Sequence, residues 1–198
     1  MFQPLEQTVG LVELARGGDT IAFARLVEKN CGRLLVLIGR RGGRALRADC
    51  EAEDLCQQVI AKAWRLLPSY EPREPGSFYP WLAALAMNTI RDRLKYLDAK
   101  GRGEVRSIES SAGSDASGRA PIDPNKTAGS VVAAREQADR LTAALARLAP
   151  DVRDVVEKHV LEGLTLDEIA ASAGIAKSTA WGRLRKGLAT LRDDLGPE

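Results

Sequence analysis

Apolar side chains recur at helical spacing along most of the chain, and no segment sustains the alternation of apolar and polar positions expected of a strand. This pattern predicts helices over residues 9–16 and 20–40, the second with a single apolar stripe. Gly42 and Gly43 interrupt the pattern, so we expect this helix pair to end there.

Two further helices are predicted before the composition changes. The first spans about 51–67, has Asp49 as its expected cap, and carries a buried seam at four-residue spacing, formed by Leu55, Val59, Ala63 and Leu67. A proline-rich loop over 69–76 interrupts the helical pattern. Ser77 is expected to cap the next helix, which continues to about Lys100.

The composition shifts sharply over residues 101–130, which are rich in Gly, Ser, Ala, Asp and Pro and nearly free of large apolar residues. Such a segment cannot bury enough apolar surface to offset its ordering entropy. Over the full sequence, an apolar content of 44% supports packed cores. The sequence therefore predicts an all-α chain with two small helical domains, residues 8–100 and 131–195, joined by a flexible linker over 101–130.

The second domain begins with two predicted helices, one ended by Pro150 and one that follows Asp151 and ends at Gly163. Residues 165–184 then have the shape of a helix-turn-helix. In that segment Thr165 and Glu168 have capping-box spacing, and Gly174 provides a left-handed turn that is cheap only for glycine. Ser178 or Thr179 is expected to open the second helix, with Leu184, Leu188 and Leu191 on its buried side.

Charge is segregated along the chain, although the net charge is only +2. Residues 177–192 are basic and contain no acid, and the arginines at 40, 41, 44 and 47 form a second basic stretch. A helix-turn-helix with a basic second helix is typical of DNA-binding proteins. The alternative interpretation is an ordinary helical hairpin with a basic face. The residues expected to face DNA are Lys177, Ser178, Thr179, Trp181, Arg183, Arg185 and Lys186; Trp181 either packs on the sugar-phosphate backbone or covers a core edge. Gly182 and Gly187 are expected to weaken this helix by up to about 1 kcal/mol each.

Three segments together resemble a known family. Residues 162–170, followed by Gly174 and by Arg183, are similar to region 4 of extracytoplasmic-function (ECF) sigma factors of the sigma-70 family. Residues 51–64 resemble region 2.2, and residues 78–94 resemble regions 2.3 and 2.4. The resemblance implies a sigma factor that binds core RNA polymerase at its β′ clamp and β flap, melts and reads the −10 promoter element, and reads the −35 element with residues 177–186.

The resemblance also assigns roles to residues of the first domain. Core-polymerase binding is expected on the polar side of the 51–67 helix, at Asp54, Gln57, Gln58, Ala61, Lys62 and Arg65. Contacts to −10 DNA are expected from Tyr70, Phe78, Tyr79, Asn88, Arg91, Arg93 and Lys95, with aromatic rings stacking on unpaired bases and the 69–77 loop forming a pocket for a flipped base. Trp81 is the ring expected in the core.

The remaining features narrow the function classes. A single histidine and no glycine-rich phosphate loop argue against an enzyme or a small-molecule substrate, which leaves a stand-alone DNA-binding regulator as the alternative to a sigma factor. The three cysteines lack the spacing of a disulfide framework or a zinc site, so we expect free thiols, no metal and no cofactor. No apolar run is long enough to enter a membrane and no secretory signal is evident, so a cytoplasmic location is expected. The resemblance further implies an anti-sigma partner.

Overall fold

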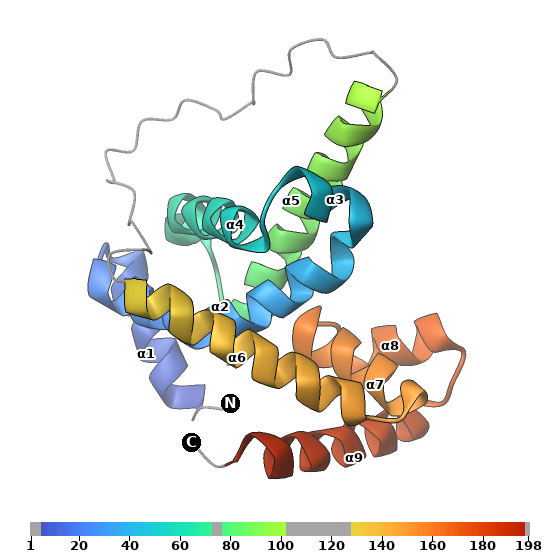
Figure 1. Cartoon of the computed structure of the whole chain (residues 1–198). Helices are drawn as coiled ribbons and strands as arrows, with labels where there is room; N and C mark the ends of the chain where they lie inside the picture. The colour runs from blue at the N-terminus through green and yellow to red at the C-terminus, as the bar shows by residue number, and fades with distance from the viewer. Residues whose placement is uncertain (1–4, 73–76, 102–127, 197–198) are drawn as a thin grey trace.

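All secondary structure in the described part of the chain is helical, which confirms the all-α prediction (Figure 1). The computed structural model describes residues 5–72, 77–101 and 128–196. Its α-helices are α1 (Leu5–Arg16), α2 (Thr20–Arg41), α3 (Gly43–Asp49), α4 (Ala52–Leu66), α5 (Phe78–Gly101), α6 (Ala128–Arg147), α7 (Pro150–Val156), α8 (Leu166–Ala173) and α9 (Lys177–Leu195). A 3₁₀ turn, Leu67–Ser69, follows α4, and a π-helical turn, η2 (Glu157–Leu161), follows α7.

Helix α2 is the centre of the first domain, and α1, α4 and α5 pack around it. Asp19 caps α2, because its carboxylate accepts hydrogen bonds from the backbone N–H groups of Ile21 and Ala22 at 2.8 and 3.0 Å. Phe23 on α2 is fully buried and its ring lies 4.9 Å from that of Trp64 on α4. The predicted seam of the α4 segment is confirmed, since Leu55, Val59, Ala63 and Leu67 are all fully buried.

The structure differs from the sequence-based expectation at both ends of α3. The chain does not end its helical run at Gly42 but turns there into α3, whose Leu46 is buried. Asp49 does not cap α4: Glu51 occupies that position without a side-chain cap bond. Instead, the Asp49 carboxylate accepts a 2.6 Å hydrogen bond from Arg93 of α5, so it ties α3 to α5.

The second domain consists of α6 to α9, and two of its boundaries differ from prediction. Helix α6 begins at Ala128, inside the segment predicted as linker, whose residues 102–127 lie outside the described part of the chain. Pro150 starts α7 rather than merely ending α6, which places Asp151 in the first turn of α7. Proline suits this position because the first N–H groups of a helix have no intrahelical partner.

The two domains contact each other along a surface that we call the docking interface, formed by α2 and the start of α5 on one side and by α6 and η2 on the other. Helix α6 lies along α2 in Figure 1. Small residues permit the approach: a β-carbon on Gly32 would lie 2.8 Å from Cβ of Gln137. Beyond the end of η2, a β-carbon on Gly163 would lie 2.6 Å from Cα of Pro80.

Candidate nucleic-acid interface

Helices α8 and α9 form the predicted helix-turn-helix, and its turn chemistry is confirmed. The Thr165 hydroxyl accepts from the Glu168 N–H at 3.3 Å, and the Glu168 carboxylate accepts from the Thr165 N–H at 2.8 Å, which completes a capping box. These bonds lower the pKa of Glu168. Gly174 is left-handed, with φ 63° and ψ 33°, and so turns the chain into α9. Ile169 is fully buried beneath this turn.

Helix α9 begins one residue earlier than predicted. Its N-cap is Ala176, which makes no side-chain cap bond, so neither Ser178 nor Thr179 opens the helix. Among the residues expected on its buried side, Leu184 and Leu191 are buried and Leu188 is half-buried. Lys177, Ser178 and Thr179 in the first turn of α9 are exposed, and the first N–H groups of a helix have no intrahelical partner.

The outward side of α9 carries the residues expected to face DNA. Lys177, Ser178, Thr179, Trp181, Arg185 and Lys186 are exposed, and Arg183 is half-buried. Trp181 is 54% exposed, so its indole forms an apolar platform beside the lysine and arginine side chains. Two of the cations already have carboxylate neighbours: Lys177 pairs with Asp167 at 2.8 Å, and Arg183 pairs with Asp151 at 3.1 Å.

Helix α4 presents a polar face opposite its buried seam. All six residues expected to bind core polymerase lie on it: Asp54, Gln58, Ala61 and Arg65 are exposed, whereas Gln57 and Lys62 are half-buried. The Lys62 ammonium donates a 3.3 Å hydrogen bond to the hydroxyl of Thr89 on α5, which fixes one edge of this face.

Helix α5 separates the residues expected to contact −10 DNA into two groups. Asn88, Arg91 and Lys95 are exposed, and Arg91 donates a 2.8 Å hydrogen bond to the Asn88 side-chain oxygen. Arg93 is half-buried and held by Asp49. The 69–77 loop is described only in part, because residues 73–76 lie outside the described part of the chain.

The aromatic residues show the opposite burial from that expected. Phe78, Tyr79 and Tyr70 are only 2%, 4% and 7% exposed, whereas Trp81, the ring expected in the core, is half-buried. Tyr70 stacks on Trp81 at 4.6 Å between ring centroids and shares a 2.7 Å hydrogen bond with the hydroxyl of Ser77. In this arrangement Phe78, Tyr79 and Tyr70 are core residues, and none of the three rings is free to stack on a base.

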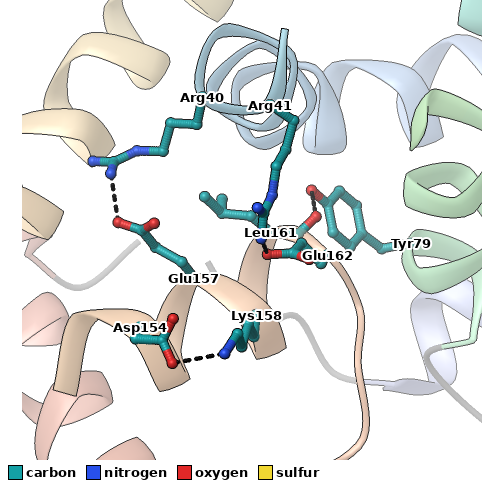
Figure 2. A network of polar contacts seen from close by, with 8 residues as sticks. All are labelled: Arg40, Arg41, Tyr79, Asp154, Glu157, Lys158, Leu161 and Glu162. Atoms are coloured by element: carbon teal, nitrogen blue, oxygen red, sulfur yellow. Dashed lines mark hydrogen bonds and ion pairs between the residues drawn. The ribbon is translucent and has the colours of Figure 1, made fainter. Parts of the chain in front are cut away.

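Tyr79 is buried because it lies at the docking interface (Figure 2). Its hydroxyl donates a 3.0 Å hydrogen bond to the backbone carbonyl of Leu161 in η2. The guanidinium of Arg33 lies 3.5 Å from the centre of its ring and donates to the carbonyl of Val160 at 2.5 Å. Burial raises the pKa of Tyr79 to about 12 and lowers that of Arg33.

Two ion pairs extend the docking interface (Figure 2). Arg40 pairs with Glu157 at 2.5 Å, and Arg41 pairs with Glu162. These contacts account for part of the basic stretch at 40–47. The sequence indicated the arginines but not their partners, which lie more than a hundred positions further along the chain.

Two kinds of site are not found in the described residues. Within them, no three His, Cys, Asp or Glu side chains gather as metal ligands would. Over the same residues, none of the helices combines the length and the apolar character needed to span a bilayer.

The fold and the α9 surface define a class: a helical protein whose second domain presents a basic helix-turn-helix to solvent, as DNA-binding proteins do. Two models of known protein families match the chain. The family model for Sigma-70 region 2 matches residues 26–99, and the one for Sigma-70, region 4 matches residues 138–191. The chain belongs to the ECF group of the sigma-70 family of RNA polymerase sigma factors, a non-enzymatic family that directs promoter-specific initiation of transcription.

Individual relatives align with most of the chain. It is 31% identical to the RNA polymerase sigma factor CarQ of Myxococcus xanthus, over 93% of this chain and 95% of that one. It is 30% identical to the ECF RNA polymerase sigma-E factor of Escherichia coli, over 81% and 80% of the two chains. Among solved structures, CnrH in complex with the cytosolic domain of CnrY is 24% identical, with a TM-score of 0.40, over 93% of this chain and 94% of that one.

Proposed function

We propose that this sigma factor reads the −35 element with the outward side of α9. The observation that carries the proposal is the composition of that surface: exposed lysine and arginine side chains, two hydroxyl residues in the first turn, and Trp181 at 54% exposure. Residues at the start of such a helix reach base edges in the major groove, and cations further along neutralise phosphates. Lys177, Ser178 and Thr179 are therefore assigned to bases, and Arg185 and Lys186 to phosphates.

The −10 element is assigned to α5. Asn88, Arg91 and Lys95 are exposed on consecutive turns of one helix and offer an amide and two cations. Tyr79 contributes its ring to melted DNA only after the second domain has moved away from α5, because the Tyr79 hydroxyl is bonded to Leu161 in the docked arrangement. Phe78 packs on Tyr70 and Trp81 and needs these rings to shift before it can reach a base. Melting of the −10 element thus requires the docking interface to open.

Core polymerase is assigned to the polar face of α4, which the docked second domain leaves exposed at Asp54, Gln58, Ala61 and Arg65. The β′ clamp is the expected partner of this face, and the β flap is the expected partner of the second domain. We assign regulation to an anti-sigma protein, the third partner that family membership implies. Co-expression with the product of the adjacent gene, followed by transcription assays, tests that assignment.

Transcription by the purified protein and core polymerase tests the central proposal. The double variant Asp54→Ala/Gln58→Ala should lose core binding and initiation while its affinity for −35 duplex stays unchanged. Asp139→Ala, on the exposed side of α6, serves as the matched control. Equal loss of core binding and DNA affinity would show that α4 has a structural role only. Failure to stimulate core polymerase at any promoter would instead favour a stand-alone regulator.

The salt dependence of duplex binding tests the α9 assignment. Each phosphate contact that is lost lowers the slope of log affinity against log salt by about 0.9. Lys186→Ala should therefore reduce the slope by about one, and Arg140→Ala, an exposed arginine of α6, should leave it unchanged. An unchanged slope for Lys186→Ala removes that residue from the phosphate contacts.

A further inference from the structure

Two cysteines from different helices meet in the first domain. Cys31 on α2 and Cys56 on α4 are 25 positions apart, and their sulfur atoms lie 3.6 Å from each other. Cys56 is only 2% exposed, whereas Cys31 is half-buried. The sequence predicted free thiols, and its spacing alone gives no sign that these two share a contact.

The two sulfur atoms have unequal surroundings. Their mutual hydrogen bond lowers the pKa of Cys31, and the same bond together with burial raises that of Cys56. A partly exposed thiol of lowered pKa beside a buried one is the arrangement that lets the first react with an oxidant and the second resolve the product. Cys50, at the end of α3, provides an internal comparison, since burial raises its pKa.

The position of the pair joins three helices. Gly32, the neighbour of Cys31, packs against Gln137 of α6. Glu53 lies one turn before Cys56 on α4 and pairs with Arg135 of α6 at 3.4 Å. A covalent link between Cys31 and Cys56 would therefore fix α4 to α2 beside residues of both helices that contact α6.

We propose that Cys31 and Cys56 form a peroxide-sensitive dithiol site that closes to a reversible disulfide. The Cys31 thiolate attacks one oxygen of a hydroperoxide and the O–O bond breaks. The other oxygen leaves with its substituent, takes up a proton and becomes an alcohol or water, and Cys31 becomes a sulfenic acid. Cys56 then attacks the Cys31 sulfur, the S–O bond breaks, and hydroxide leaves with the Cys56 proton as water. Two thiols lose two electrons and one peroxide gains them.

The two sulfur atoms are already near bonding distance. A disulfide bond is about 2.05 Å long, so the two sulfur atoms must approach each other by about 1.5 Å. Rotation about the Cα–Cβ bonds of the two cysteines moves their sulfur atoms toward each other. The proposal concerns the thiols themselves and stands whether or not α4 binds polymerase.

Treatment of the full chain with hydrogen peroxide tests the proposal. The number of free thiols should fall from three to one. The intact mass should fall by two hydrogen atoms, and proteolytic mapping should join Cys31 to Cys56. Dithiothreitol should restore all three thiols. Cys50→Ser should form the same disulfide, whereas Cys56→Ser should stop at a Cys31 sulfenic acid that dimedone traps.

Other outcomes overturn the proposal. One is a disulfide that includes Cys50. A second is survival of both thiols at a peroxide concentration that oxidises Cys50. A third is equal formation of the Cys31–Cys56 bond in the native chain and in the urea-unfolded chain, because the folded geometry then contributes nothing. The mapping uses the unsubstituted protein, so these results hold even where a cysteine variant fails to fold.

Discussion

Gly187 marks the point where α9 crosses α7 most closely, and its substitution gives the sharpest test of this packing. A β-carbon there would lie 2.3 Å from Cγ2 of Val156 and 3.0 Å from Cγ1 of Val152. Both valines are buried, and β-branched side chains have one strongly preferred rotamer in a helix, so neither methyl group can turn aside easily. Gly182, one and a half turns earlier, is exposed and would place a β-carbon in open space.

The two alanine variants should therefore shift stability in opposite directions. Alanine is favoured over glycine by about 1 kcal/mol inside a helix, and overpacking a core costs about 1–3 kcal/mol. Gly182→Ala should gain up to about 1 kcal/mol, whereas Gly187→Ala should lose up to about 2 kcal/mol after the two effects are combined. Urea unfolding of the full chain, monitored by circular dichroism, measures the free energy of unfolding of both variants. A Gly187→Ala protein at least as stable as the unsubstituted one would refute the packing described here.

Three further predictions concern the docking interface and the helix-turn-helix. Tyr79→Phe removes the 3.0 Å hydrogen bond to Leu161 and should lower the free energy of unfolding by about 1 kcal/mol in urea, with Tyr96→Phe as the control; equal effects of the two variants would contradict the prediction. Burial raises the pKa of Tyr79 from 10 to about 12, so the folded protein favours the neutral phenol. The contribution of this shift to the free energy of unfolding is therefore complete below pH 10 and is lost between pH 10 and 12. Phenolate absorbance should then show one tyrosine titrating last, and that step should vanish in Tyr79→Phe. Thr165→Ala breaks the capping box and should lower the free energy of unfolding by about 1 kcal/mol. Ser172→Ala, also on α8, should change the free energy of unfolding by less than about 0.5 kcal/mol. Similar losses in the two variants would contradict the stabilising role of the cap.

Features with a local cause could be predicted from sequence. The α4 seam follows from four-residue spacing on one helix, and each of its four residues is fully buried. The Thr165–Glu168 box needs partners only three positions apart, and the left-handed turn at Gly174 needs only one residue type. The polar face of α4 was predictable for the same reason, because it is the complement of the seam.

Features with a distant cause could not be predicted. Asp49 has the composition of a helix cap, yet its partner is Arg93, 44 positions away. In an isolated helix Gly187 is expected only to lower helix stability. The close contact of α7 with α9 is what makes a residue without a β-carbon necessary there. The predicted burial of the aromatic residues was wrong for a related reason. Helical spacing assigns one buried face, whereas Tyr79 is covered by η2, a segment of the other domain, and Trp81 remains partly exposed.

Opening of the docking interface would reconcile the burial of Tyr79 with the −10 role proposed for it. Where α6 packs on α2 it buries small residues, Gly32 on α2 and Ala134 and Ala138 on α6, and nearby the interface buries Tyr79 against Val160 and Leu161. Its ion pairs, Arg40–Glu157 and Arg41–Glu162, are partly exposed, and such pairs contribute about 0–1 kcal/mol each. Away from the interface, large apolar residues such as Phe23 and Leu145 are fully buried within each domain. A DNA or polymerase partner that favours the open form can therefore expose Tyr79 by breaking the docking contacts, whereas Phe78 stays packed on Tyr70 and Trp81 of its own domain.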